Sequence, residues 1–269
     1  MKLTHFSLFS GIGGIDLAAE WAGFETVGQC EWADYPIRVL EKHWPDVPRW
    51  GDIRDVTLQS VREKGIGKIT LMSGGDPCPI RSRARSNGAS KHPDLSGYFL
   101  ALVGQLRPGW VVRENVPAPD DVDFEAALEA IGYRSVIVRT DAAETTGQSR
   151  QRDFIVGSSE ETWPSKALQL SFIEGGPGNY KTRLGTRQVI PALTTHRTRY
   201  DSRDYYVWDR AGMRILDGDE RTSFAGFPAG WLAGLSEAAI ARVCGNAVVP
   251  AQVYPILQSI ADIERGMVA

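Results

Sequence analysis

Apolar runs of strand length alternate with amphipathic helical stretches through the first 157 residues of the chain. The expected strands cover residues 4–10, 24–31, 68–75, 109–115, 134–142 and 150–158. The expected helices cover residues 15–23, 35–44, 95–106 and 123–133. Strands and helices that follow one another in this order predict an α/β domain with a mostly parallel sheet.

The alternation weakens between residues 158 and 235, where Gly, Pro and Thr are frequent. Such composition predicts a small, loop-rich lobe. Helical sequence returns at Ser236, and an apolar stripe near the C-terminus needs the α/β core as its partner: Val253, Ile256, Leu257, Ile260 and Ile263. We therefore expect a main domain of residues 1–157 plus 236–269, and a lobe of residues 158–235.

No apolar run approaches the roughly 18 to 20 residues that a membrane-spanning helix needs. The opening stretch MKLTHFSLFSGIGG has one lysine and a short apolar patch, and charged helical sequence follows it. This is a poor signal peptide. We expect a cytoplasmic protein without a membrane partner.

The cysteines are odd in number and form no CxxC pair: Cys30, Cys78 and Cys244. The histidines are scattered, and none pairs with another at metal-ligand spacing: His5, His43, His92 and His196. These counts argue against a disulfide scaffold and against a metal site.

Two basic stretches lie on a chain whose net charge is −3. Residues 81–91 hold four basic residues and no acid, and residues 181–203 hold six Lys or Arg with one acid. Such local charge indicates a localised anionic partner. A solvated charged surface explains runs of this kind about as often.

The stretch FSGIGG follows the first expected strand, where open α/β sheets bind ligands beyond their strand ends. Gly11 and Gly13 fit a dinucleotide fingerprint, but Asp16 replaces the third glycine, which a pyrophosphate requires. Glu31 stands 20 residues after Gly11, where an acid binds a ribose diol, and Asp52 is placed to accept from an adenine amino group. Together these residues predict a phosphate-free adenosine cofactor, with S-adenosylmethionine as the first candidate. Taken alone, the glycines also fit a tight strand-to-helix turn.

The stretch GGDPCPIRSRAR, residues 74–85, holds a cysteine between two prolines, and three arginines follow. The prolines exclude a regular helix and a central strand. Cys78 follows the third apolar run, so we expect it to face the same cleft as the glycine turn. Neighbouring positive charge favours the nucleophilic thiolate. An isolated cysteine is more often a packing residue, but Pro77, Pro79 and the preceding glycines argue against that here.

Three further polar residues are candidates for the same cleft. Glu114 ends an apolar strand, and burial there disfavours its charged form, which makes it a candidate proton donor. A carboxylate that caps the following turn is an equally good explanation. Arg150 and Arg152 precede another strand, either as a clamp for an anion or carbonyl or as surface charge.

These groups suit one reaction. Cytosine C5 is a poor nucleophile, but a thiolate that adds to C6, helped by protonation at N3, turns C5 into an enamine carbon. That carbon can take a methyl group from a sulfonium donor, and loss of the C5 proton with expulsion of the thiolate restores the ring.

The chain resembles the DNA cytosine-5 methyltransferase family over nearly its whole length, with the motifs in the family's order. FSLFSGIGG resembles the first motif, GGDPCP the Pro-Cys motif, ENV the acid motif and QSRQR the Gln-x-Arg-x-Arg motif. IPALTT with ERTSFAGFPAGW is similar to the ninth motif, and GNAVVP to the last. The resemblance implies a Rossmann-like, S-adenosylmethionine-dependent fold with a small target-recognition lobe. It also implies methylation at C5 of a cytosine flipped out of DNA.

Residue by residue, the resemblance makes Cys78 the nucleophile and Glu114 the group that assists at N3. It places Arg150 and Arg152 at the target base and at the catalytic loop, and makes Trp32 an adenine-stacking residue. The cofactor residues that it implies are Phe9, Gly11, Gly13, Glu31, Trp32, Asp52, Asn246 and Val248.

The implied partner is double-stranded DNA, which a loop over residues 80–94 would hold as it closes on the flipped base. The implied DNA contacts are Ser82, Arg81, Arg83, Arg85, Lys91, Arg183 and Arg187. The chain departs from the family at Pro79, where Gln is usual, and in a recognition region reduced to residues 159–188. We expect a monomer, with a cognate restriction endonuclease as a further partner.

Three alternatives stay open at this point. The nearest alternative is the same chemistry on tRNA, which nothing in the sequence strongly excludes. A non-catalytic DNA-binding relative is disfavoured by the intact Cys78, Glu114 and Arg152. A folate-dependent pyrimidine methylase also uses a cysteine, but the glycine turn and Glu31 do not suit its cofactor.

Overall fold

A computed structural model describes residues 2–77, 94–118, 121–159, 206–209 and 212–267 of the chain. The strands are β1 (Leu3–Leu8), β2 (Phe24–Cys30), β3 (Arg49–Trp50), β4 (Leu71–Gly74), β5 (Trp110–Asn115), β6 (Tyr133–Asp141), β7 (Gln151–Ser159), β8 (Tyr206–Asp209) and β9 (Gly212–Ile215). The α-helices are α1 (Gly14–Trp21), α2 (Asp34–His43), α3 (Leu58–Glu63), α4 (Ser96–Leu106), α5 (Asp121–Ala130), α7 (Gly218–Phe224), α8 (Glu237–Asn246) and α9 (Pro250–Glu264). Two 3₁₀ turns are η1 (Ile53–Asp55) and η2 (Ala142–Glu144).

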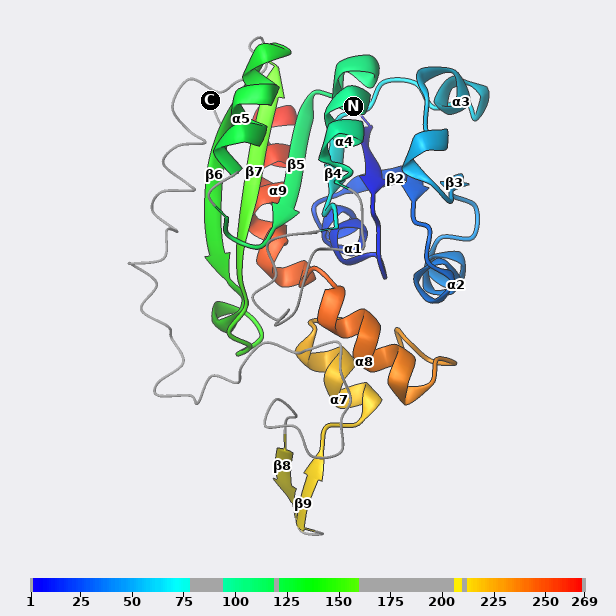
Figure 1. Ribbon diagram of the computed structural model, residues 1–269, viewed down its shortest axis with the longest axis vertical. Helices are drawn as coiled ribbons and strands as arrows, with labels where there is room; N and C mark the ends of the chain where they lie inside the picture. Colours follow the sequence, from blue (N-terminus) through cyan, green and yellow to red (C-terminus); the bar gives the residue numbers. More distant parts are fainter. Residues whose placement is uncertain (1, 78–93, 119–120, 160–205, 210–211, 268–269) are drawn as a thin grey trace.

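Seven strands form one sheet in the order β3-β2-β1-β4-β5-β7-β6, and β8 with β9 forms a separate hairpin (Figure 1). Strands β1 to β5 run parallel, whereas β7 pairs antiparallel with β5 and with β6. The predicted α/β fold with a mostly parallel sheet is confirmed. The chain builds outward from β1 to β3 and then returns to place β4 on the other side of β1. Open α/β sheets bind ligands at such a switch point.

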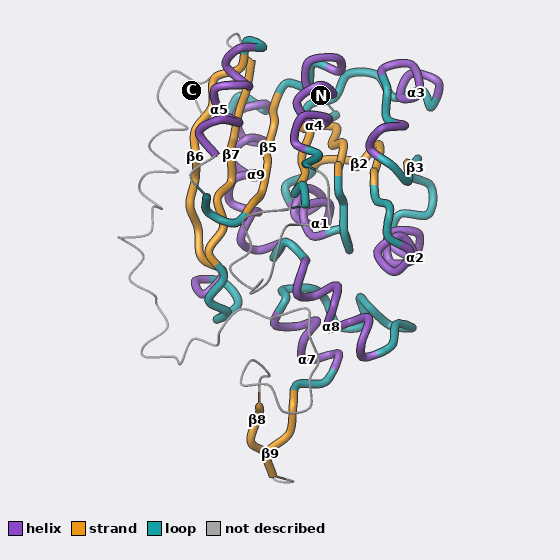
Figure 2. The backbone as a smooth tube through the Cα atoms, in the orientation of Figure 1, coloured by secondary structure: helices purple, strands orange, loops and turns teal. Residues whose placement is uncertain are grey.

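Side chains of the central strands alternate between two helical layers, as the pleat of a strand requires. In β5, Trp110 and Val112 pack with α1 and α9, whereas Val111 packs with α3, α4 and α5. In β7, Phe154 and Ile155 divide in the same way. Helices therefore cover both faces of the sheet (Figure 2).

The predicted apolar stripe of α9 is buried against α1 and the sheet. Val253, Leu257 and Ile260 have no exposed surface. Ala18 and Ala19 on α1 are also fully buried, and their small side chains let the two helices approach closely. The stripe and its predicted partner are confirmed.

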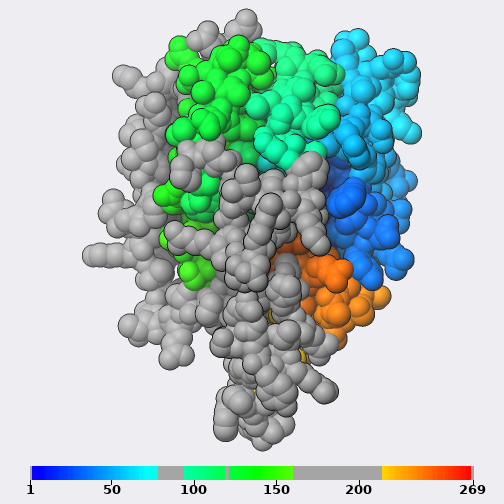
Figure 3. Space-filling model, in the orientation of Figure 1, coloured from blue at the N-terminus to red at the C-terminus, as the bar shows by residue number. Residues whose placement is uncertain are grey.

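The segment 216–235 packs with the first helices of the chain. Leu216, Phe227 and Trp231 share an apolar cluster with α2 and α8, and Trp231 Nε1 donates to the Ile12 carbonyl at 3.0 Å. The blue N-terminal surface and the orange surface of the C-terminal helices lie side by side in the space-filling view (Figure 3). The domain boundaries, including a lobe over 158–235, stay a prediction, because residues 160–205 and 210–211 lie outside the described part of the chain.

Close packing at the start of α1 gives a test of this arrangement. A Cβ on Gly14 would lie 2.2 Å from the carbonyl oxygen of Val248, a backbone atom that cannot rotate away. We expect Gly14→Ala to lower the free energy of unfolding by about 1 to 3 kcal/mol, measured by urea titration with circular dichroism. The matched control is Gly104→Ala in α4, where a Cβ meets nothing within 4 Å. That change removes backbone freedom and is expected to stabilise by about 0.5 to 1 kcal/mol. Equal stabilities of the two variants would contradict the packing.

Candidate active site at the carboxyl ends of the strands

The polar residues that the sequence singles out converge on one edge of the sheet. Strands β1, β2, β4 and β5 run parallel, so their carboxyl ends share that edge. Strand β7 runs the other way and therefore begins there. The edge brings together the glycine turn after β1, Glu31 after β2, Asp76 after β4, Glu114 in β5 and Arg152 in β7.

The turn after β1 is closed by a carboxylate from β2. Phe9, Gly11 and Gly13 have φ values of 52°, 56° and 83°, in the left-handed region. Glu31 accepts from the Gly11 N–H at 2.8 Å and from the Ala33 N–H at 2.9 Å. Burial raises the pKa of Glu31, and these hydrogen bonds partly offset the rise. The carboxylate thus organises the turn and keeps lone pairs for a ribose diol.

The two residues expected around an adenine differ in their availability. Trp32 is 71% exposed, so its ring is free to stack on a flat ligand. Asp52 lies on the connection after β3 and already binds Arg54, with Arg54 Nε to Oδ1 at 2.9 Å and Nη2 to Oδ2 at 2.5 Å. The hydrogen bonds from Arg54 lower the pKa of Asp52 to about 2. An adenine amino group would therefore meet a carboxylate that already has one partner.

Arg150 is buried and holds the connection between α8 and α9. Its Nη1 donates to the Gly245 carbonyl at 3.1 Å and its Nη2 to the Ala247 carbonyl at 2.8 Å. Burial, followed by the charge of Arg152, lowers the pKa of Arg150 to about 9, which leaves it charged at neutral pH. The guanidinium thus faces backbone carbonyls on either side of Asn246.

The same connection reaches the cofactor edge. Asn246 is exposed, and the carbonyl of Val248 packs on Gly14 at the start of α1. Val248 therefore lies beside the start of α1, directly after the glycine turn. Arg150 binds the carbonyls of the two residues that flank Asn246. The role of Asn246 and Val248 in cofactor binding stays a prediction.

Glu114 and Arg152 form an ion pair of 2.7 Å between Oε1 and Nε. In the antiparallel register Glu114 lies opposite Phe154, so Arg152 is its diagonal neighbour on the same face of the sheet. Glu114 is buried, and its Oε2 would lie 2.8 Å from a Cβ on Gly75. The chain between β4 and Cys78 therefore passes directly against the acid, and the ion pair fixes the direction of its carboxylate.

Several predicted residues fall outside the described part of the chain. These are Cys78, Pro79, Arg81, Ser82, Arg83, Arg85, Lys91, Arg183 and Arg187, together with residues 80–93 of the loop expected over 80–94. The other two cysteines, Cys30 and Cys244, are free and buried, and burial raises the pKa of each to about 12. Neither forms a thiolate near neutral pH.

The sequence predicts neither a metal site nor a membrane-spanning helix, and the structure can be searched for both among the described residues. Within the part of the chain that the structure describes, no three His, Cys, Asp or Glu residues gather as a metal site would require. In those same residues no helix has both the length and the apolar character for crossing a bilayer.

Asp16 has a structural role that was not predicted: it lies wholly buried beneath the glycine turn. It accepts from Ser7 Oγ at 3.0 Å and from Gln29 Nε2 at 2.9 Å, and Gln29 in turn accepts from Arg49. Burial raises the pKa of Asp16 to about 6, and its hydrogen bonds partly oppose the rise. The only signal in the sequence was an acid where a third glycine was expected.

Comparison with known proteins now identifies the family. The model of the C-5 cytosine-specific DNA methylase family matches residues 3–183. The Type II methyltransferase M.AquIA of Picosynechococcus is 35% identical over 218 residues, which cover 72% of this chain and 86% of the relative. M.HindV of Haemophilus influenzae is 33% identical over 226 residues, covering 77% of this chain and 70% of the relative. The chain belongs to the C-5 cytosine-specific DNA methylase family.

Solved structures agree with this methylase fold. A variant of Spodoptera frugiperda DNMT2 has a TM-score of 0.70 at 15% identity and covers 97% of this chain and 99% of its own. A putative DNA modification methyltransferase from an Escherichia coli prophage has a TM-score of 0.70 at 19% identity. The match covers 98% of this chain and 100% of that structure's chain. The predicted family and the predicted Rossmann-like methyltransferase fold are confirmed. The family and the fold imply S-adenosylmethionine as the methyl donor of this C5 methylase.

The buried Asp16 gives this methylase a predictable pH dependence. The pKa of Asp16 is about 6 in the folded state and 3.8 in the unfolded chain. Between these two pH values, Asp16 is therefore protonated more often in the folded protein than in the unfolded chain. Stability from this group is therefore fully present below pH 3.8 and is lost as the pH rises through 6. The difference between these two pKa values corresponds to about 3 kcal/mol of stability.

The measurement compares the wild type with Asp16→Asn by urea unfolding between pH 4 and pH 7. The stability of the wild type relative to the variant is expected to fall by about 2 kcal/mol across this range, because Asn does not titrate. A difference that stays constant with pH would contradict the burial of an ionisable Asp16.

Proposed function

We propose that this protein transfers a methyl group from S-adenosylmethionine to C5 of a flipped-out cytosine in double-stranded DNA, through a covalent bond between Cys78 and C6. The observation that carries the proposal is the Glu114–Arg152 ion pair beside Gly75, at the strand ends from which the chain leads to Cys78. This arrangement supports a nucleophile and an acid that approach one pyrimidine ring.

The glycine turn suits the cofactor on its own geometry. A Cβ on Gly11 would meet nothing within 4 Å, so the space beside the turn is open to a ligand. Gly11 and Gly13 would face the methionine part with Phe9, Glu31 would bind the ribose, and Trp32 would stack on the adenine. When bound, S-adenosylmethionine supplies an electrophilic methyl group on a sulfonium centre.

The residues of this chain carry the remaining steps. The Cys78 thiolate adds to C6 while Glu114 gives a proton to N3, so the displaced electron pair develops at C5 as an enamine. Arg152, which pairs with Glu114, would orient this acid and bind the base carbonyl. Once C5 is methylated, its proton leaves to a base, the C6–sulfur bond breaks, and Glu114 recovers the N3 proton as the ring regains its double bond.

Elimination supports Cys78 as the nucleophile. The chain has three cysteines, and Cys30 and Cys244 are buried as neutral thiols. The thiolate is the nucleophilic form of cysteine. Cys78 is thus the remaining thiol, two residues after the buried Asp76.

DNA binding in this proposal depends on the two basic stretches, residues 81–91 and 181–203. Arg81, Arg83, Arg85 and Lys91 would contact phosphates around the flipped base, and their contribution falls as the salt concentration rises. The relatives named Type II methyltransferases favour a restriction endonuclease as a functional partner of this chain. A monomer is proposed because one chain carries all the catalytic groups.

Cys78→Ala is expected to abolish methyl transfer, because no other group can add to C6. Tritiated-methyl incorporation into duplex DNA measures this, and Cys244→Ala is the control that keeps its activity. Duplex DNA containing 5-fluorocytosine is expected to form a covalent complex at Cys78, mapped by mass spectrometry. An adduct elsewhere, or an active Cys78→Ala variant, would contradict the mechanism.

The choice of substrate needs parallel assays on duplex DNA and on tRNA. Faster methyl transfer to tRNA would replace DNA as the substrate in the proposal.

Glu114→Gln is expected to lower turnover by about 100-fold or more, because Gln cannot give a proton to N3. Calorimetry is expected to show S-adenosylmethionine affinity unchanged within about twofold, since the acid acts on the base and not on the cofactor. The control is Glu125→Gln, which removes a partly buried carboxylate bonded to Ser135 away from the strand ends. A large loss of cofactor affinity in Glu114→Gln would assign Glu114 a structural role instead.

A further inference from the structure

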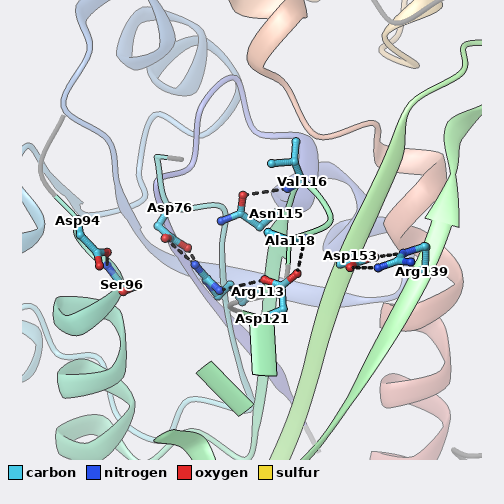
Figure 4. A network of polar contacts seen from close by, with 10 residues as sticks. All are labelled: Asp76, Asp94, Ser96, Arg113, Asn115, Val116, Ala118, Asp121, Arg139 and Asp153. Carbon is cyan, nitrogen blue, oxygen red and sulfur yellow. Dashed lines mark hydrogen bonds and ion pairs between the residues drawn. The ribbon is translucent and has the colours of Figure 1, made fainter. Parts of the chain in front are cut away.

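A second ion pair lies directly beside the proposed catalytic groups and takes no part in the chemistry. Arg113 Nε donates to Asp76 Oδ1 at 2.5 Å, and Arg113 Nη2 donates to Asp76 Oδ2 at 2.8 Å (Figure 4). Both side chains are almost fully buried, at 2% and 3% exposed. Asp76 stands two residues before Cys78, and Arg113 stands one residue before Glu114.

The same guanidinium also reaches the chain that leaves the acid strand. Arg113 Nη1 lies 3.6 Å from Asp121 Oδ1 at the start of α5, and Asp121 Oδ2 accepts from the Ala118 N–H at 3.2 Å. The guanidinium carbon lies 4.2 Å from the ring centroid of Phe124. Arg113 therefore links the end of the chain before Cys78, the strand that carries Glu114 and the turn that follows it.

Neighbouring residues of β5 turn these two ion pairs to opposite faces of the sheet. Val111 packs with α4 and α5, and Arg113 follows it on that face, whereas Glu114 follows Val112 on the face of α1 and α9. Gly74 pairs with Arg113 in the parallel register, so Asp76 emerges beside it. The Asp76–Arg113 pair thus holds the backbone from behind the face on which Glu114 meets Arg152.

We propose that Arg113 and Asp76 are positioning residues for methyl transfer, which set the thiol of Cys78 against the carboxyl of Glu114. The inference rests on the proposed function. One residue extends a chain by at most about 3.6 Å, so fixing Asp76 limits the region that a thiol two residues later can reach. A misplacement of about 1 Å in a reacting group costs on the order of 100-fold in rate.

The two-point geometry explains why an arginine serves this purpose. A planar guanidinium that donates two parallel hydrogen bonds fixes the angle of a carboxylate as well as its distance. Lysine keeps the positive charge but binds as a point, so the carboxylate can rotate about it. Arg113→Lys therefore separates alignment from charge balance.

The experiment compares Arg113→Lys and Asp76→Asn with Arg139→Lys. Arg139 makes a similar two-point contact with Asp153, with distances of 2.7 and 2.6 Å, on strands β6 and β7. We expect Arg113→Lys and Asp76→Asn to lower kcat by about 10- to 100-fold, with KM for DNA and cofactor within about threefold. Arg139→Lys is expected to keep kcat within about twofold of wild type. Melting temperatures and cofactor calorimetry establish that each variant is folded.

A second readout does not need turnover. Iodoacetamide alkylation of Cys78 is followed by mass spectrometry across pH, with Cys30 and Cys244 buried. We expect its pH profile to differ from wild type in Arg113→Lys and to be unchanged in Arg139→Lys. If the wild type methylates no nucleic acid, the proposed function fails, and this profile alone decides the positioning.

Three results would overturn the inference. One is a kcat within twofold of wild type in both folded variants. Another is an equal loss in Arg139→Lys, which would indicate general destabilisation. The third is failure of both Arg113→Lys and Asp76→Asn to yield cofactor-binding protein, which would make the pair a folding requirement only.

Discussion

Strand β5 pairs in parallel with β4 and antiparallel with β7, and the site depends on this placement. Because β7 runs antiparallel to β5, β7 begins at the edge of the sheet where β1, β2, β4 and β5 end. Arg152 can therefore meet Glu114, although the two lie 38 positions apart in the sequence. A fully parallel sheet would place the start of that strand at the opposite edge, away from the acid.

In the proposed site, the cofactor side is formed by residues from both ends of the sequence. The glycine turn and Glu31 follow the first two strands, whereas Asn246 ends α8 and Val248 lies on the connection from α8 to α9. Arg150 joins the second group to β7 through two backbone carbonyls, and Gln252 Nε2 returns a hydrogen bond to the Arg150 carbonyl at 2.9 Å. Burying a charge in this way requires such hydrogen bonds, because an unpaired guanidinium in the core is costly.

Six of the seven strands of the sheet and several polar residues at their ends could be predicted, because hydrophobic periodicity and strand-end glycines are local signals. The two-residue strand β3 is too short to show such a pattern. The hydrogen-bond and ion-pair partners of the buried charged residues could not be predicted. In the sequence, Arg113 is one charged residue near the end of an apolar strand. Only the pairing of Gly74 with Arg113 brings Asp76 to it. Arg150 similarly shows its backbone partners only once α8 and α9 pack against the sheet. These contacts depend on how distant strands and helices pair and pack, and a short stretch of sequence does not contain that information.

A buried ion pair is weak evidence for stability, since apolar residues of similar volume often serve the core as well. The place of the Asp76–Arg113 pair is better explained by geometry. Apolar side chains would fill the space behind β5, but they would leave the segment from Gly75 to Pro77 free to rotate about the end of β4. Two parallel hydrogen bonds remove that rotation on the face opposite Glu114, so the alignment of the acid strand and the thiol-bearing segment does not compete with the reacting groups for space.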